Sequence, residues 1–311
     1  APRAFRGGHP PSLGAAVALD HRGGPGPAMR RSSNRPTGQT PGRPACTAYN
    51  ARMDICRLHR GTAPLLVSLP HDGSALPEGL AGRLTDSARR VPDTDWHVSR
   101  LYDFARELGA SVLVPYYSRY VVDLNRPPDD TSLYPGQNTT GLCPVTQFSG
   151  EPVYRPGREP DAAEIAARVE RYWRPYHATL QAELGRLRAE HGRVVLWEGH
   201  SIRGRLPYLF EGELPDLNLG TAGGASCSPA LQRRLEQVLA AQGRYSHVVN
   251  GRFKGGYITR HYGRPDAGVE AVQLELAQRT YMDEDSFRYL PERACHLQAV
   301  LRQLLEATLS L

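Results

Sequence analysis

Long apolar runs are missing from this 311-residue chain. No stretch approaches the ~18 to 20 apolar residues that a membrane-spanning helix needs, so no membrane span is expected. The five cysteines are odd in number and none lies in a C-x-x-C pair, which argues against a disulfide framework. We therefore expect reduced thiols in a cytoplasmic protein.

Several motifs of common enzyme classes are missing as well. There is no G-x-G-x-x-G and no G-x-x-x-x-G-K-[ST], so nucleotide phosphate binding has no support. No G-x-S-x-G turn is present, and Ser201 stands on no recognisable nucleophile turn, which disfavours a serine hydrolase. An H-E-x-x-H helix is also missing, so histidine ligands of a metal would have to come from distant parts of the chain.

Acidic residues are almost missing from positions 1–52, which hold eight arginines and only Asp20. The formal net charge of +6 therefore belongs to this segment and gives no reason to expect nucleic-acid binding by the rest. Eight glycines and eight prolines predict disorder there. The segment is either a basic tail for polyanions or, as we favour, a leader upstream of a natural start at Met53. The remaining residues, 53–311, are expected to form a single domain.

The hydrophobic pattern beyond position 60 alternates between strands and helices. Such alternation predicts an α/β fold with a mainly parallel sheet and helices on both faces, in which ligands bind beyond the carboxyl ends of the strands. A Pro/Gly-rich loop is expected over 126–160. The expected strands are 65–69, 111–115, 193–198 and 245–249. One helix is expected to begin near Asp95, and four others are expected at about 161–190, 228–242, 268–279 and 291–309.

Polar residues follow several of these strands. His71 and His200 stand at two predicted strand ends, each beside or next but one to a glycine. Imidazole and carboxylate groups are the ligands of a catalytic zinc, which takes three from the protein and keeps one position open. The two histidines thus indicate a metal site or, read separately, two ordinary histidines. A third ligand could be Asp72, Asp95 or Glu198.

Polar and charged residues in three other places also indicate a site for an acidic ligand, and two of these places allow a second interpretation. Arg119, Asn125 and Arg126 follow the strand at 111–115, and an arginine fork is suited to a carboxylate. Glu275 lies in an apolar run. It could be a buried general base, or an ordinary carboxylate paired with Arg279 four residues later. The segment 250–263, with Gly255 and Gly256, is a donor-rich loop over an anion or a solvated turn.

In their order and combination, these motifs resemble those of the N-formylglutamate amidohydrolase family. The resemblance runs from about Met53 to the C-terminus and rests on the segments 59–71, 94–97, 122–126, 255–263 and 273–276. It implies a fold and a metal chemistry similar to those of zinc carboxypeptidases (a phosphorylase/hydrolase-like fold) and aspartoacylases. The spacing H-x-x-E of carboxypeptidases is absent, because Ser74 stands where the glutamate would be.

The resemblance also implies roles for individual residues. One Zn²⁺ would be held by His71, His200 and, as the preferred third ligand, Asp95. Glu275 would activate water and Arg119 would polarise the scissile carbonyl. The substrate would be held by Asn125, Arg126, Gly256, Tyr257 and Arg260.

The activity that the resemblance implies is hydrolysis of N-formyl-L-glutamate to formate and L-glutamate, a step of histidine degradation. Because formyl is small, affinity would come from the two carboxylates of the glutamate, with Arg126 and Arg260 as the cations. Two alternatives stay open. One is an amidohydrolase for another N-acyl amino acid, and the other is a catalytically idle protein that binds acidic metabolites. No nucleic-acid or membrane partner is expected, and the sequence gives no oligomeric state.

Overall fold

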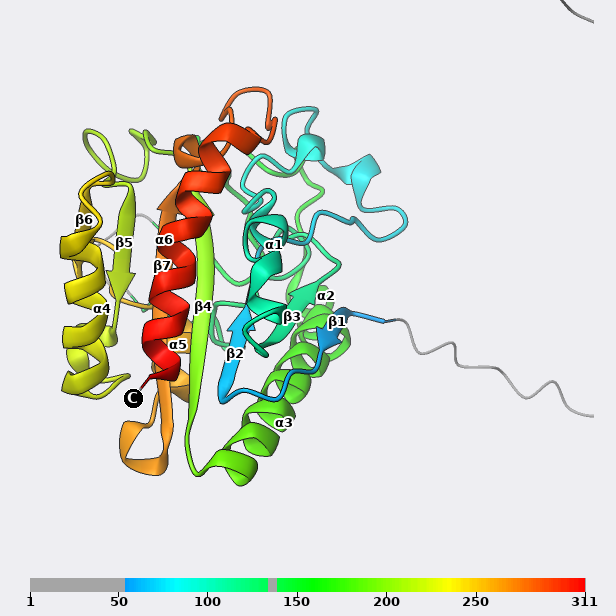
Figure 1. Cartoon of the computed structure of the whole chain (residues 1–311). Coiled ribbons are helices and arrows are strands. Elements are labelled where there is room, and N and C mark those ends of the chain that lie inside the picture. Colours follow the sequence, from blue (N-terminus) through cyan, green and yellow to red (C-terminus); the bar gives the residue numbers. More distant parts are fainter. Residues whose placement is uncertain (1–53, 134–138, 311) are drawn as a thin grey trace, which may run out of the picture. The chain divides into compact units, whose positions relative to one another are not determined.

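The computed structural model describes residues 54–133 and 139–310. They form a seven-stranded sheet of order β1-β3-β2-β4-β7-β5-β6 (Figure 1). Pairing is parallel except at β1–β3 and β5–β7, so the expected α/β class with a mainly parallel sheet is confirmed. The strands are β1 (Cys56–His59), β2 (Leu65–Ser68), β3 (Ser111–Pro115), β4 (Val194–Ile202), β5 (Leu217–Gly220), β6 (His247–Val249) and β7 (Val269–Ala277).

Helices cover both faces of the sheet (Figure 1). Buried residues of α1 (Val98–Leu101), α4 (Pro229–Ala241) and α6 (Pro291–Leu309) belong to one hydrophobic cluster. The other cluster contains residues of α3 (Arg174–His191) and α5 (Tyr257–Tyr262), and of the π-helical turn Val169–Trp173 that joins α3 to α2 (Ala162–Arg168). Each layer therefore has its own core against the sheet.

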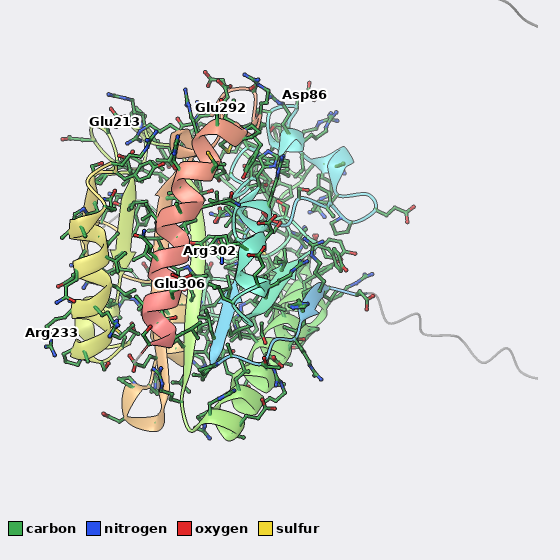
Figure 2. All side chains as sticks on the ribbon, viewed as in Figure 1. Asp86, Glu213, Arg233, Glu292, Arg302 and Glu306 are labelled. Atoms are coloured by element: carbon green, nitrogen blue, oxygen red, sulfur yellow. The ribbon has the colours of Figure 1, made fainter. Side chains whose placement is uncertain are left out.

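Local sequence explains where these helices begin and which side they bury. Ser228 caps α4 by accepting a hydrogen bond from Leu231 N, and Pro229 fits the first helical position. The face of α4 with Leu231, Leu235 and Leu239 is fully buried. On α6 the outer face instead carries Arg302 and Glu306, as Figure 2 shows. Amphipathic spacing thus fixes the orientation of each helix on the sheet.

The predicted helix over 268–279 is wrong, because the segment forms strand β7. β7 lies between β4 and β5, and its residues from Ala271 to Ala277 are all buried. A strand buried on both faces shows no clear alternation of polar and apolar residues, and it is hard to distinguish from a helix by pattern. The helix expected from Asp95 is also broken, into α1 and a 3₁₀ turn at Asp103–Arg106. Strands β1 and β5 were missed.

The predicted leader, residues 1–52, lies outside the described residues. Within the described parts, no helix combines the length and the apolar character needed to cross a membrane.

A chain that begins at Met53 is expected to unfold at the same temperature as the full chain and to keep its kcat/KM. The physical reason is that, among the residues that the structure describes, both large hydrophobic clusters are built from Ile55 onward. Thermal unfolding and steady-state kinetics on the two chains check this. A chain that begins at Gly61 is the control. It also loses β1, whose four residues pair with β3, and should be less stable. Loss of stability on removing residues 1–52 alone would contradict the single-domain assignment.

Candidate metal centre and active site

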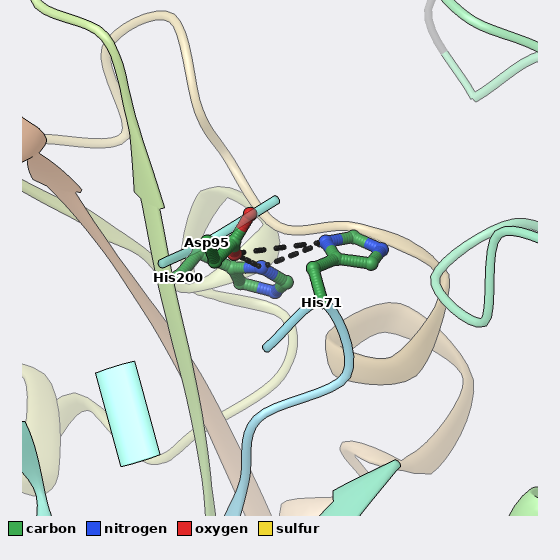
Figure 3. Close-up of side chains that lie close together, drawn as sticks. All are labelled: His71, Asp95 and His200. Carbon is green, nitrogen blue, oxygen red and sulfur yellow. Dashed lines mark hydrogen bonds and ion pairs between the residues drawn. The ribbon is translucent and has the colours of Figure 1, made fainter. Parts of the chain in front are cut away.

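Two histidines and an aspartate meet at the carboxyl-terminal edge of the sheet. His71 follows β2, His200 lies near the end of β4, and Asp95 precedes α1. His200 Nδ1 lies 3.0 Å from Asp95 Oδ2 and 3.2 Å from His71 Nδ1, and His71 Nδ1 lies 3.7 Å from Asp95 Oδ2. Figure 3 shows the three side chains converging. One ligand atom from each lies within 4.8 Å of the others, the arrangement expected of a metal centre.

Each histidine has a carboxylate on its far side. His71 Nε2 lies 2.7 Å from Asp123 Oδ1, and His200 Nε2 lies 2.7 Å from Glu198 Oε1. Because a carboxylate accepts a hydrogen bond from an N–H group, both rings carry a proton on Nε2. In the neutral form of each ring, Nδ1 would then be the nitrogen able to bind a metal. Carboxylates that hold histidines in this way are typical of metal sites in proteins.

The three candidates for the third ligand occupy different positions. Asp72 Oδ1 accepts a hydrogen bond from Ser99 N, 3.0 Å away, at the start of α1. Glu198 accepts a hydrogen bond from His200 Nε2 and further hydrogen bonds from the backbone and hydroxyl of Thr259. Asp95 alone among them joins the cluster with the two histidines. Of the three carboxylates, Asp95 is therefore the one that lies with both histidines, and its role as third ligand stays a prediction.

Electrostatics at this centre favour a cation. Burial raises the pKa of Asp95, but hydrogen bonds with His200 and His71 and the charge of Arg119 outweigh it and hold the pKa well below the usual range. Burial likewise opposes ionisation of Asp123, and the charges of His71 and Arg126 lower its pKa below the usual range. Glu198 and Glu275 are buried nearby. Such a concentration of carboxylates around two imidazoles is suited to a divalent metal ion.

Glu275 stands beside the centre on β7. It is paired in register with His200 of β4 on one side and with Asn218 of β5 on the other. Its side chain lines the same cavity as the three candidate ligands and is 7% exposed. Burial raises the pKa of Glu275 to about 8, although the neighbouring His200 acts in the opposite direction. A carboxylate with such a proton affinity is suited to accept a proton near neutral pH.

The predicted arginines and asparagine line a cavity of about 100 Å³ over the centre. Arg119 Nη2 donates to Asp95 Oδ1 at 3.3 Å, and its guanidinium lies over the ring of Phe148. Arg119 Nε is buried and has no hydrogen-bond partner within the described parts of the chain. Arg126 Nε donates to Thr140 O at 2.8 Å. Arg119, which lines the cavity, thus keeps a buried N–H group from which a ligand oxygen could accept a hydrogen bond.

Asn125 fits closely against Gly256. A Cβ atom on Gly256 would lie 2.3 Å from Asn125 Nδ2, so only glycine permits this approach. Asn125 Oδ1 accepts a hydrogen bond from Ile258 N at 2.9 Å, and both Asn125 and Gly256 line the cavity. Both residues that the sequence predicted to contact substrate thus lie at the cavity, and the contact itself stays a prediction.

Two predicted substrate contacts lie elsewhere. Tyr257 packs on Trp173 and His261, and Arg260 Nε donates to Gly255 O at 2.8 Å; neither lines the cavity. The cation that does line it from this region is Arg252, whose Nη2 donates to Leu209 O and whose guanidinium lies over Phe210. No sequence signal separated Arg252 from Arg260, because both belong to one donor-rich segment.

An apolar wall was also missed by the sequence analysis. Phe148, Ile202, Leu209 and Phe253 line the cavity from three separate segments, and they belong to one small hydrophobic cluster. Gln273 lines it too and accepts a hydrogen bond from Gly256 N at 2.7 Å. The cavity therefore combines cations with a hydrophobic side, which suits an acidic ligand with a methylene stem.

Comparisons with known proteins find one family by both sequence and fold. A sequence model of the N-formylglutamate amidohydrolase family matches residues 63–282. The N-formylglutamate deformylase of Pseudomonas aeruginosa is 56% identical over 258 residues, covering 83% of this chain and 97% of the relative. The N-formylglutamate deformylase of Pseudomonas putida is 54% identical over 257 residues, covering 82% and 96%. The crystal structure of an N-formylglutamate amidohydrolase from Ralstonia eutropha superposes with a TM-score of 0.70 at 26% identity, covering 82% of this chain and 98% of that one.

Proposed function

Because the chain belongs to the N-formylglutamate amidohydrolase family, we propose that its cavity hydrolyses N-formyl-L-glutamate to formate and L-glutamate with one bound Zn²⁺. The observation that carries this proposal is the convergence of His71, Asp95 and His200 beside the buried carboxylate of Glu275. Curated relatives that bear the deformylase name at more than half identity, over nearly their whole length, support the same substrate.

The ligands that would hold the metal are His71 Nδ1, His200 Nδ1 and Asp95 Oδ2. When bound at such a site, zinc lowers the pKa of water and polarises a carbonyl oxygen. Three protein ligands leave the open position that a catalytic site requires.

Glu275 performs the proton transfers in this account. It accepts a proton from water as the water oxygen bonds to the formyl carbon, and it returns that proton to the glutamate nitrogen as the C–N bond breaks. Arg119 donates an N–H to the oxygen that becomes negative at the formyl carbon. Loss of one such donor typically raises the barrier by about 3–4 kcal/mol.

The substrate carboxylates require cations, because the formyl group itself offers few contacts. Arg126 and Arg252 line the cavity in addition to Arg119, which already contacts Asp95. A guanidinium has five N–H donors, so a bond to a backbone carbonyl leaves it able to contact a carboxylate as well. We assign Arg126, with Asn125, to one carboxylate of the substrate and Arg252 to the other.

Formate release from N-formyl-L-glutamate tests the proposal. The purified protein should release one formate per glutamate. Formate release should stop after treatment with a chelator and should resume when Zn²⁺ is added. N-acetyl-L-glutamate and N-formyl-L-methionine in the same assay distinguish a deformylase from an amidohydrolase for other N-acyl amino acids. A protein that binds N-formylglutamate but releases no formate would be the idle binder instead.

Arg126→Ala is expected to raise KM for N-formylglutamate by about 10- to 100-fold, the effect of losing a hydrogen bond to a charged group. The kcat should change much less, because Arg126 holds a carboxylate equally in the ground state and the transition state. Steady-state kinetics check the split. A fall in kcat at unchanged KM would show that Arg126 acts on the reacting bond.

Arg252→Gln is expected to reduce the preference for N-formylglutamate over N-formylglutamine, because the glutamine side chain carries no charge to be matched. Arg260→Gln is the matched control from the same segment and should preserve that preference. Competition between the two substrates gives the ratio of kcat/KM values directly. If the control variant loses the preference and Arg252→Gln keeps it, the second cation is Arg260, as the sequence alone suggested.

A further inference from the structure

Two backbone carbonyls flank Asn125, and each accepts a hydrogen bond from a buried ring. His177 Nε2 donates to Leu124 O at 2.9 Å, and Trp173 Nε1 donates to Arg126 O at 3.0 Å. Both rings come from the helical layer behind the segment, one at the end of the π-helical turn and the other on the first turn of α3. The carbonyls of the substrate-binding segment are therefore held on either side of Asn125.

The His177 ring is also fixed at its other nitrogen. Since Nε2 donates to a carbonyl, Nδ1 of the neutral ring is an acceptor, and the hydroxyl of Tyr262 donates to it at 2.9 Å. Tyr262 ends α5, while the first turn of that helix donates Ile258 N to Asn125 Oδ1 at 2.9 Å. Burial lowers the pKa of His177 to about 3, so the ring stays neutral at physiological pH.

The π-helical turn Val169–Trp173 precedes α3 at this point. A π-turn changes the angular spacing of side chains along a helix and is frequently found at functional sites. Trp173 is its last residue, and its ring stacks on His177 with centroids 3.7 Å apart and an interplanar angle of 22°. The stacked pair directs its two N–H groups to the carbonyls on either side of Asn125.

Neither ring lines the cavity. Trp173 and His177 are 6% and 4% exposed, and the cavity is lined by other residues, Asn125 and Arg126 among them. We propose that Trp173 and His177 are positioning residues, which fix Asn125 and Arg126 in the geometry that grips a substrate carboxylate. This inference rests on the proposed function, because it assigns those two residues to substrate binding.

Trp173→Phe and His177→Leu each remove one N–H donor, and His177→Gln keeps a donor near the position of Nε2. We expect KM for N-formylglutamate to rise about three- to tenfold in the first two, as for the loss of one hydrogen bond, with kcat nearly unchanged. The glutamine variant should recover most of the wild-type KM. A glutamine variant no better than the leucine variant would overturn the role of the donor.

A double-mutant cycle separates positioning from general stability. In the Arg126→Ala background, Trp173→Phe should raise KM little further, because the residue through which Trp173 acts is gone. Tyr176→Phe is the control. Tyr176 is fully buried on the same helix, but its hydroxyl is paired with Ser68 Oγ at 2.8 Å, so its loss should leave KM unaltered. An equal KM rise from Trp173→Phe in both backgrounds would contradict the proposal.

Hydrogen exchange of the backbone tests the same inference without substrate. Peptides that cover 122–128 should exchange faster in Trp173→Phe and His177→Leu than in wild type, and Tyr176→Phe should not change them. If wild-type protein releases no formate, the proposed function fails while this exchange difference remains. If formate release is normal but exchange and KM are unchanged in both variants, the positioning role fails alone. If His177→Leu does not fold, KM and hydrogen exchange of Trp173→Phe alone test the proposal.

Discussion

Replacing Glu275 by glutamine is expected to lower kcat for N-formylglutamate by about 10²- to 10⁴-fold, the usual contribution of a general base. The glutamine is nearly isosteric but cannot take a proton from water. Because the proposed role of Glu275 is confined to the making and breaking of bonds, the variant should still bind substrate, and calorimetry would measure that binding. Its metal content should equal that of the wild type, since Glu275 is not among the candidate ligands.

Glu270→Gln is the matched control for this experiment. Glu270 lies on the same strand, but its carboxylate accepts hydrogen bonds from the backbone and hydroxyl of Ser228 at the start of α4. That variant should lose some stability and keep its kcat. Near-normal kcat in Glu275→Gln would show that another group is the base, and Glu198, two positions before His200, would be examined next.

Replacing His71 or His200 by alanine is expected to abolish both metal binding and formate release. Each is one of the three proposed ligands of a buried site, and two remaining ligands would not complete the coordination that zinc requires. Metal analysis of purified protein should give about one zinc per wild-type chain and almost none per variant chain.

Two further variants, one with a smaller expected effect on metal binding and one with none, serve as comparisons. Asp123→Asn keeps all three proposed ligands and weakens the hold on His71 Nε2, so metal affinity should fall by about 10- to 100-fold. His97→Ala removes a histidine two residues after Asp95 whose Nε2 contacts Phe287 O, and its metal content should be unchanged. A His71→Ala variant with full zinc and full activity would contradict the assigned centre.

Residues at strand ends could be predicted from sequence because parallel strands bring their carboxyl ends to one edge. His71, Arg119 and His200 follow or end such strands, and all three line one cavity. Glu275 was singled out for a different physical reason, as a carboxylate among apolar residues, although its strand was taken for a helix. Burial of β7 on both faces removed the alternation that would have identified it.

Other parts of the site depend on contacts that no local pattern encodes. The choice among Asp72, Asp95 and Glu198 follows from which carboxylate caps α1 and which supports His200. Arg252 was missed because the fold, and not its local sequence, brings it to the cavity. Trp173 and His177 read as ordinary core residues of a helix, since their partners lie about 50 positions away in the chain.

Diffraction data collected above and below the zinc absorption edge, on crystals of protein purified without added metal, test the central claim most directly. The account predicts one anomalous peak per chain, about 2.0–2.2 Å from His71 Nδ1, His200 Nδ1 and an oxygen of Asp95, the usual zinc–ligand distances. A peak at any other group of residues, or no peak in crystals of fully active protein, would contradict it.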